Sequence, residues 1–78
     1  MMQASEFIAR IEKEFEDVKP GTITPETEFR KLEGWSSMMA LIVIACIDEA
    51  YGVTLTAEEL NRCHSISDLF QLVMSKAA

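Results

Sequence analysis

The chain has 78 residues, a hydrophobic content of 49% and a formal net charge of −6. This length predicts a single domain over residues 1–78, and the few glycines and prolines favour a packed fold over disorder. The acidic balance disfavours nucleic acids and anionic membranes as partners, because phosphate contacts need lysine and arginine.

The first predicted helix carries one apolar stripe. The stripe consists of Phe7, Ile8, Ile11, Phe15 and Val18, whose spacing follows the period of an α-helix. The helix is expected to end where Lys19-Pro20-Gly21 breaks the chain. The start, MMQASEFIAR, lacks the basic residues and long apolar core of a secretory signal. Free cysteine thiols, expected at Cys46 and Cys63, suit a reducing environment, so we expect a cytoplasmic protein.

A long connection is predicted over residues 19–35. Thr24-Pro25-Glu26 has the pattern of a helix start, with a cap, a proline and an acid, so we expect a brief helical turn there. Ile23, Phe29 and Leu32 are expected to hold the connection against the core. A connection of this length is unusual in a small bundle and is often functional.

Three further helices are predicted after the connection. The second runs from Ser36 or Ser37 to Tyr51 and stops at Gly52. Capping boxes open a short third helix at Thr56 and a fourth at Ser65. The apolar stripe of the fourth consists of Ile66, Leu69, Phe70 and Val73. No segment alternates with period two, so the expected fold is all-α, a small four-helix bundle with three longer helices and one short one.

The residue types that commonly carry catalysis are sparse. Cys46 and Cys63 fit no metal spacing and are expected to be free packed thiols, although a disulfide between them stays open. His64, the only histidine, is expected to be structural or exposed. No catalytic triad, metal cluster or phosphate-binding glycine loop is evident, so we predict no catalytic residue, no metal site and no enzyme activity.

Two adjacent hydroxyls, Ser36 and Ser37, stand at the start of the second helix. The first backbone N–H groups of a helix are unpaired and the helix dipole is positive there, so a phosphate ester on one hydroxyl would be stabilised. Plain N-capping by one serine would use the same position. The pattern alone leaves both interpretations open.

Two stretches around this helix resemble the acyl carrier protein family. They are LEGWSSM at residues 32–38 and IDEAYGVTL at residues 47–55. The family motif is Asp-Ser-Leu at the start of the second helix, followed near its end by acidic residues and an aromatic. The likeness covers most of the chain and implies an acyl-carrier-protein-like bundle. It also implies a covalent 4′-phosphopantetheine whose thiol holds acyl groups, on a protein that is not itself a catalyst.

Matching the motif backwards from Tyr51 places Ser37 on the modified serine, Met38 on the leucine and Ser36 on the aspartate. The resemblance thus implies that Ser37 is the attachment residue and Ser36 a cap without the family's charge. Trp35 would either pack against the connection or flank the arm.

The implied partners are a phosphopantetheinyl transferase and enzymes that transfer or modify acyl groups. The cargo, whether from fatty acid, polyketide, aminoacyl or related metabolism, stays open. The alternative is an unmodified helical interaction module.

The acids near the end of the second helix indicate which of its sides faces water. At about 100° per residue, Asp48 and Glu49 share their side with an apolar group made of Met38, Leu41, Ile42 and Ala45. The opposite, core-facing side holds Ala40, Val43, Ile47 and Ala50. Exposed apolar patches usually mark contact sites. We therefore expect partners to bind this apolar group and Glu49, and the chain to be a monomer, with self-association through the same patch as the alternative.

Overall fold

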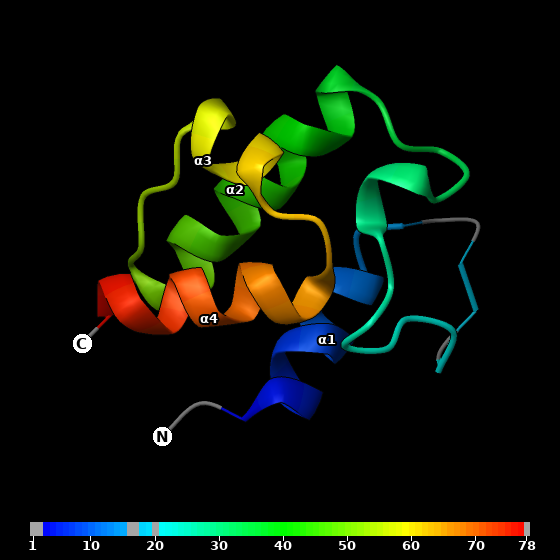
Figure 1. The fold of residues 1–78 in the computed structure, drawn as a ribbon, viewed down its shortest axis with the longest axis horizontal. Coiled ribbons are helices and arrows are strands. Elements are labelled where there is room, and N and C mark those ends of the chain that lie inside the picture. Colours follow the sequence, from blue (N-terminus) through cyan, green and yellow to red (C-terminus); the bar gives the residue numbers. More distant parts are fainter. Residues whose placement is uncertain (1–2, 16–17, 20, 78) are drawn as a thin grey trace.

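The computed structural model describes residues 3–15, 18–19 and 21–77, and within these ranges the chain is helical without a strand. The elements are α1 (Ala4–Glu12), the 3₁₀ helix η1 (Phe29–Lys31), α2 (Ser37–Tyr51), α3 (Ala57–Arg62) and α4 (Ile66–Ala77). In Figure 1, α4 crosses the front of the molecule, with α1 below it and α2 and α3 above it. The predicted all-α bundle of three longer helices and one short one is confirmed. No helix in the described ranges is long and apolar enough to cross a bilayer.

The helices share one apolar core, and Phe7 of α1 lies at its centre. Its ring is fully buried and meets Phe70 of α4 edge-on, with 5.4 Å between the ring centroids. Tyr51, the last residue of α2, packs against the same ring at 5.8 Å. The short α3 contributes Leu60, which is also fully buried. One aromatic side chain thus joins α1 to both α2 and α4.

The first helix ends earlier than predicted. α1 stops at Glu12, so Phe15 and Val18 lie beyond it, although Phe15 is still buried in the core. The Glu12 carboxylate accepts hydrogen bonds from the backbone N–H groups of Gly21 and Ile23, at 3.0 and 2.9 Å. These contacts hold the start of the connection against the end of α1. Part of the predicted break, at Pro20, lies outside the described residues.

The brief helical turn of the connection lies later than predicted. At Thr24, a turn closes when Thr27 N–H donates to the Thr24 carbonyl at 3.0 Å and Thr24 N–H donates to the Thr27 hydroxyl at 2.8 Å. Threonine side chains can compete in this way with helical hydrogen bonds. The 3₁₀ helix instead forms at Phe29–Lys31. The predicted anchors are confirmed, since Ile23 and Phe29 are buried and Leu32 packs against the core.

The predicted start and end of α2 are confirmed. Ser36 is its N-cap and Gly52 its C-cap. Gly52 has a positive φ of 68°, a conformation that favours glycine, and its N–H donates to the Asp48 carbonyl at 2.8 Å.

Reciprocal capping boxes open the last two helices. Thr56 Oγ1 accepts from Glu59 N–H at 3.1 Å, and Glu59 Oε1 accepts from Thr56 N–H at 3.0 Å. The same exchange joins Ser65 and Asp68, with both distances 3.2 Å. Both boxes satisfy amides that would otherwise lack helical partners, as the sequence predicts.

The start of α4 also holds the long connection in place. Ile66 N–H donates to the Thr27 carbonyl at 2.9 Å, and Ser67 N–H donates to the Pro25 carbonyl at 2.8 Å. The first turn of α4 is therefore capped partly by backbone that lies some forty residues earlier in the chain. These two hydrogen bonds hold the connection against the bundle at residues 25–27, ahead of the start of α2.

Folding stability is expected to fall in acid because two capping carboxylates have lowered pKa values. The Lys76 ammonium, followed by Thr56 N–H, lowers the pKa of Glu59, and the N–H groups of His64 and Ser65 lower the pKa of Asp68. A carboxyl with a lower pKa in the folded state stabilises the fold above its unfolded pKa, which is about 4. That contribution is lost as pH falls through the folded pKa.

Melting temperatures between about pH 7 and pH 3 would measure this effect. The double variant Glu59→Gln, Asp68→Asn should melt lower than wild type at neutral pH and lose less on acidification. Equal losses in the two proteins would show that other groups govern acid unfolding.

Candidate functional site

The two serines at the start of α2 differ in backbone conformation and in the hydrogen bonds of their hydroxyls. Ser36 is extended, with φ −158° and ψ 176°, and its hydroxyl accepts a hydrogen bond from Met39 N–H at 3.2 Å. Ser37 is the first residue of the helix and is exposed. The first helical hydrogen bond runs from Ala40 N–H to the Ser36 carbonyl at 3.0 Å. The amides of Ser37 and Met38 precede it and have no helical acceptor.

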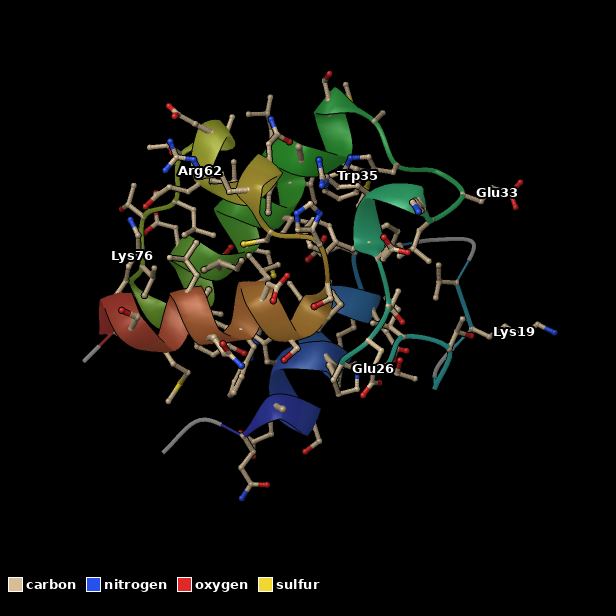
Figure 2. The ribbon with its side chains drawn as sticks, in the orientation of Figure 1. Lys19, Glu26, Glu33, Trp35, Arg62 and Lys76 are labelled. Carbon is tan, nitrogen blue, oxygen red and sulfur yellow. The ribbon has the colours of Figure 1, made fainter. Side chains whose placement is uncertain are left out.

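A tight turn leads the chain into this helix start. Trp35 N–H donates to the Leu32 carbonyl at 3.1 Å, and Gly34 within the turn has φ +91°, which side chains with a Cβ rarely adopt. The Trp35 ring stacks on Phe15 at 6.2 Å and meets Phe29 edge-on at 5.3 Å. Figure 2 shows Trp35 beside η1, next to the start of α2. The aromatic contacts therefore fix the backbone that carries the two serines.

A surface depression of about 430 Å³ lies directly beside the serines. It lies between α2 and α3, and residues from both helices line it: Trp35, Ser36, Ser37, Ala40, Leu41, Ala57 and Asn61. Both uses that the sequence suggests for Trp35 are thus compatible, because the ring packs against the connection and also borders the depression. Ala57 and Asn61 were not predicted from the sequence. No sequence signal marks them, because their place depends on how α3 packs on α2.

The outer face of α2 is apolar close to the serines. Met38 and Leu41 are the large exposed apolar side chains, with exposed fractions of 70% and 64%. Ala45 and Glu49 are exposed as well, and Ile42 is half-buried. The predicted outer face is confirmed except at Ile42, which lies at its border. On the predicted core-facing side, Ala40 and Ala50 are half-buried and not buried, and Ala40 borders the depression. Val43 and Ile47 are buried as predicted, and Cys46 joins them.

Negative charge is absent from the first turn of α2. Asp48 and Glu49 lie more than ten residues further along, roughly 16–18 Å at about 1.5 Å per residue. Glu33, the acid that precedes the serines in the connection, points away from the body of the protein in Figure 2. The first turn of α2 thus carries no acidic side chain, although the whole chain is acidic.

Other candidate residues have structural roles. His64 is exposed, and its Nδ1 lies 3.3 Å from a guanidinium nitrogen of Arg30. Cys46 and Cys63 are free and buried, and burial raises the pKa of both thiols, with a further increase at Cys46 from Glu14. This confirms the interpretation of both as packed thiols. Within the part of the chain that the structure describes, no cluster of three or more possible ligands could hold a metal ion.

Comparison with known families identifies the chain's class. Residues 13–73 match the family profile described as phosphopantetheine attachment site. The chain belongs to this family. No curated protein and no solved structure matches it.

Members of the phosphopantetheine-attachment family are carriers and not catalysts. They hold a covalent 4′-phosphopantetheine group and interact with phosphopantetheinyl transferases and with enzymes that handle acyl groups. The matched residues include the whole of α2 and α3 together with the depression between them.

Proposed function

We propose that the chain is an acyl carrier that bears 4′-phosphopantetheine on Ser37 and serves fatty acid, polyketide or related biosynthesis in the cytoplasm, as a monomer. The observation that carries this assignment is the difference between the two serines. The Ser36 hydroxyl is engaged in the helix cap. Ser37 is exposed, and its hydroxyl has no hydrogen-bond partner among the described residues. Of the two serines at the start of α2, Ser37 is thus the one whose hydroxyl is free for a transferase.

The residues around Ser37 fit a phosphate ester. Ser37 begins a helix of 15 residues, whose dipole is positive at this end. The amides of Ser37 and Met38, which have no helical acceptor, can donate to phosphate oxygens there. When attached, the group supplies a thiol that carries acyl groups as thioesters.

Incubation of the purified chain with coenzyme A and a broad-specificity phosphopantetheinyl transferase tests the proposal. Intact-mass measurement should show a gain of one phosphopantetheine unit. If several transferases of different specificity give no gain, the chain is an unmodified interaction module.

Ser36→Asp is expected to speed modification at Ser37 several-fold. Ser36 keeps the capping oxygen but lacks the carboxylate that the family motif has at this position, and Glu33 does not replace it. An aspartate would keep the cap and add a negative charge at a helix N-terminus, where it is favourable. Initial rates with one transferase, compared between wild type and variant, measure the effect. Equal rates would show that the charge at this position is dispensable.

We further propose that partner enzymes bind the outer face of α2 through Met38, Leu41, Ile42, Ala45 and Glu49. Any enzyme that acts at Ser37 must cover the first turns of α2, where Met38 and Leu41 are exposed. Asp48 and Glu49 lie roughly 16–18 Å along α2 from Ser37, beyond the roughly 10 Å over which exposed charges interact at 0.1 M salt, so the face near Ser37 offers apolar groups and no acid. Apolar contact should therefore dominate, and affinity should change little as salt rises.

Met38→Glu is expected to raise the transferase's KM for the carrier by about tenfold. Burying a methionine side chain contributes about 1.5–3 kcal/mol, and about 1.4 kcal/mol corresponds to a factor of ten. Met38 is a better probe than the half-buried Ile42, because a change at an exposed site should leave the melting temperature nearly unchanged. Gln71→Glu adds the same charge at an exposed site on α4 and should leave the KM unaltered. A similar rise in both variants would mean that added charge alone weakens binding.

A further inference from the structure

Two basic side chains from distant parts of the chain meet away from the two serines. Arg30 belongs to η1 in the long connection, and His64 lies between α3 and α4. The distance from a guanidinium nitrogen of Arg30 to His64 Nδ1 is 3.3 Å. We propose that this contact is a pH-sensitive switch. Neutral His64 binds Arg30 and ties η1 to the junction of α3 and α4, whereas protonated His64 releases Arg30 and turns to the carboxylate of Asp68.

The contact between Arg30 and His64 requires a neutral imidazole. A guanidinium has only donors and keeps its charge throughout the physiological pH range. Nδ1 must therefore accept the hydrogen bond, which places the ring proton on Nε2. A proton on Nδ1 would remove the acceptor and put a second positive charge 3.3 Å from the first. The contact is thus incompatible with the protonated ring.

The charge of Arg30 is not neutralised by a carboxylate. Its side chain is half-buried, and no ion pair among the described residues includes it. Its Nε is buried and has no hydrogen-bond partner within the described part of the chain. Lys31, the next residue of η1, is paired with Glu28 at 3.3 Å. Arg30 therefore presents its full charge to the histidine ring.

Asp68 of α4 offers the protonated ring a second partner. Its Oδ2 accepts hydrogen bonds from the backbone N–H groups of His64 and Ser65, at 3.0 and 3.2 Å. The carboxylate thus lies within reach of the His64 side chain, and these N–H groups lower the pKa of Asp68, so it is ionised where histidine titrates. The ring is exposed and can turn about its side-chain bonds. Since Asp68 attracts the charged ring and Arg30 repels it, protonation should exchange the partners with little change in folding stability.

The other charged groups of the junction are held in ion pairs. Arg62 and Glu59 of α3 bind Glu58 and Lys76, at 2.6 and 2.7 Å. Cys63 is buried, and burial raises the pKa of its thiol, so it stays neutral. Between about pH 5.5 and 7.5, the histidine is therefore the group at this junction whose charge changes.

Release of Arg30 should act on η1 and leave the rest of the connection in place. Phe29 of η1 is 1% exposed, and the carbonyls of Thr27 and Pro25 accept hydrogen bonds from the start of α4. None of these contacts involves the histidine ring. The expected effect of acidification is thus a local loosening of the 3₁₀ turn just before Trp35, while the bundle stays folded.

NMR spectra of the ¹⁵N-labelled, unmodified chain test the proposal between about pH 5.5 and 7.5. The ring resonances of His64, the only histidine, should change with the same midpoint as Arg30 Nε–H and the backbone amides of residues 29–31. Below that midpoint, these amides should exchange with solvent several-fold faster, after correction for the intrinsic pH dependence of exchange. If the ring titrates while residues 29–31 do not respond, the proposal is overturned.

Arg30→Met should uncouple η1 from the histidine. The substitution removes the guanidinium together with its unpaired buried Nε, so the variant should fold as well as wild type. Residues 29–31 should then no longer follow the titration of the ring. Lys31→Met is the matched control, because it removes a cation from the same turn but outside the contact. Loss of the coupling in both variants would mean that the charge of η1 in general, and not the contact, is responsible.

Two substitutions of the histidine fix its charge. His64→Lys carries a permanent positive charge and should give η1, at about pH 7.5, the spectrum and exchange rates of acidified wild type. His64→Gln is uncharged and should hold both constant across the range. Each variant keeps the backbone N–H that binds Asp68, so the cap of α4 is retained. A pH response of η1 that persists in His64→Gln, or a neutral-pH state of η1 in His64→Lys, would contradict the switch.

Discussion

Replacing Ser37 with alanine is expected to abolish loading with phosphopantetheine completely. The substitution removes the one free hydroxyl at the start of α2 and keeps a residue of high helix propensity in the first helical position. The fold should therefore be intact, and the far-ultraviolet circular dichroism and melting temperature should be close to those of the wild type. Intact-mass measurement after incubation with coenzyme A and a transferase reads out the loss.

Ser36→Ala supplies the matched control. This variant should still gain the phosphopantetheine unit, because Ser37 is unchanged. It should also be less stable by about 0.5–2 kcal/mol, the usual cost of losing an N-cap, since the Met39 amide would lose its acceptor. The two alanine variants would thus distinguish the roles of the serines: Ser37→Ala loses the mass gain, and Ser36→Ala loses stability. A mass gain in Ser37→Ala, or its loss only in Ser36→Ala, would show that the attachment residue is misassigned.

Phe29→Ala is expected to lower the free energy of unfolding by about 3–5 kcal/mol, as for other buried phenylalanines. Phe29 is 1% exposed and holds the long connection in the core while its ring meets Trp35 edge-on. A chain of this length has a total stability of only about 4–12 kcal/mol. The loss would therefore remove a large share of the total stability, and the midpoint of unfolding would move to a much lower denaturant concentration.

Urea unfolding monitored by Trp35 fluorescence measures this change. Phe29→Leu is the control, because it keeps most of the apolar volume and should cost less than about 1.5 kcal/mol. The emission of folded Phe29→Ala should also change, since the Trp35 ring loses one of its two aromatic neighbours. Equal destabilisation by both substitutions would mean that the ring itself, and not its volume, anchors the connection.

The helix boundaries that could be predicted are those set by neighbouring residues. Ser36, Gly52 and Thr56 cap helices through partners three or four residues away, so the local pattern contains the whole interaction. The end of α1 could not be predicted in this way. The Glu12 carboxylate binds amides nine and eleven residues further on. Phe15 then enters the core from outside the helix, although its spacing continues the helical stripe.

In the candidate site, too, the residues that could be predicted are those whose role depends on the local sequence. Ser37 follows from the motif and from its place at a helix start, and the exposure of Met38 and Leu41 follows from the helical period. Ala57 and Asn61 reach the site only through the packing of α3 on α2, which leaves no trace in their own surroundings in the sequence. Ile42 lies near the boundary between the two faces of α2, where a small rotation decides between exposure and burial.

The two backbone hydrogen bonds that the first turn of α4 makes to the connection have a consequence for local unfolding. Ile66 and Ser67 donate to carbonyls of Thr27 and Pro25, so the connection cannot detach without leaving these amides unpaired. In native-state hydrogen exchange, such amides open together with the element they bind, as one cooperative unit. The segment before Ser37 and the start of α4 should therefore behave as a single foldon. The backbone that leads to Ser37 would therefore stay in place on the bundle while the proposed arm moves between enzymes.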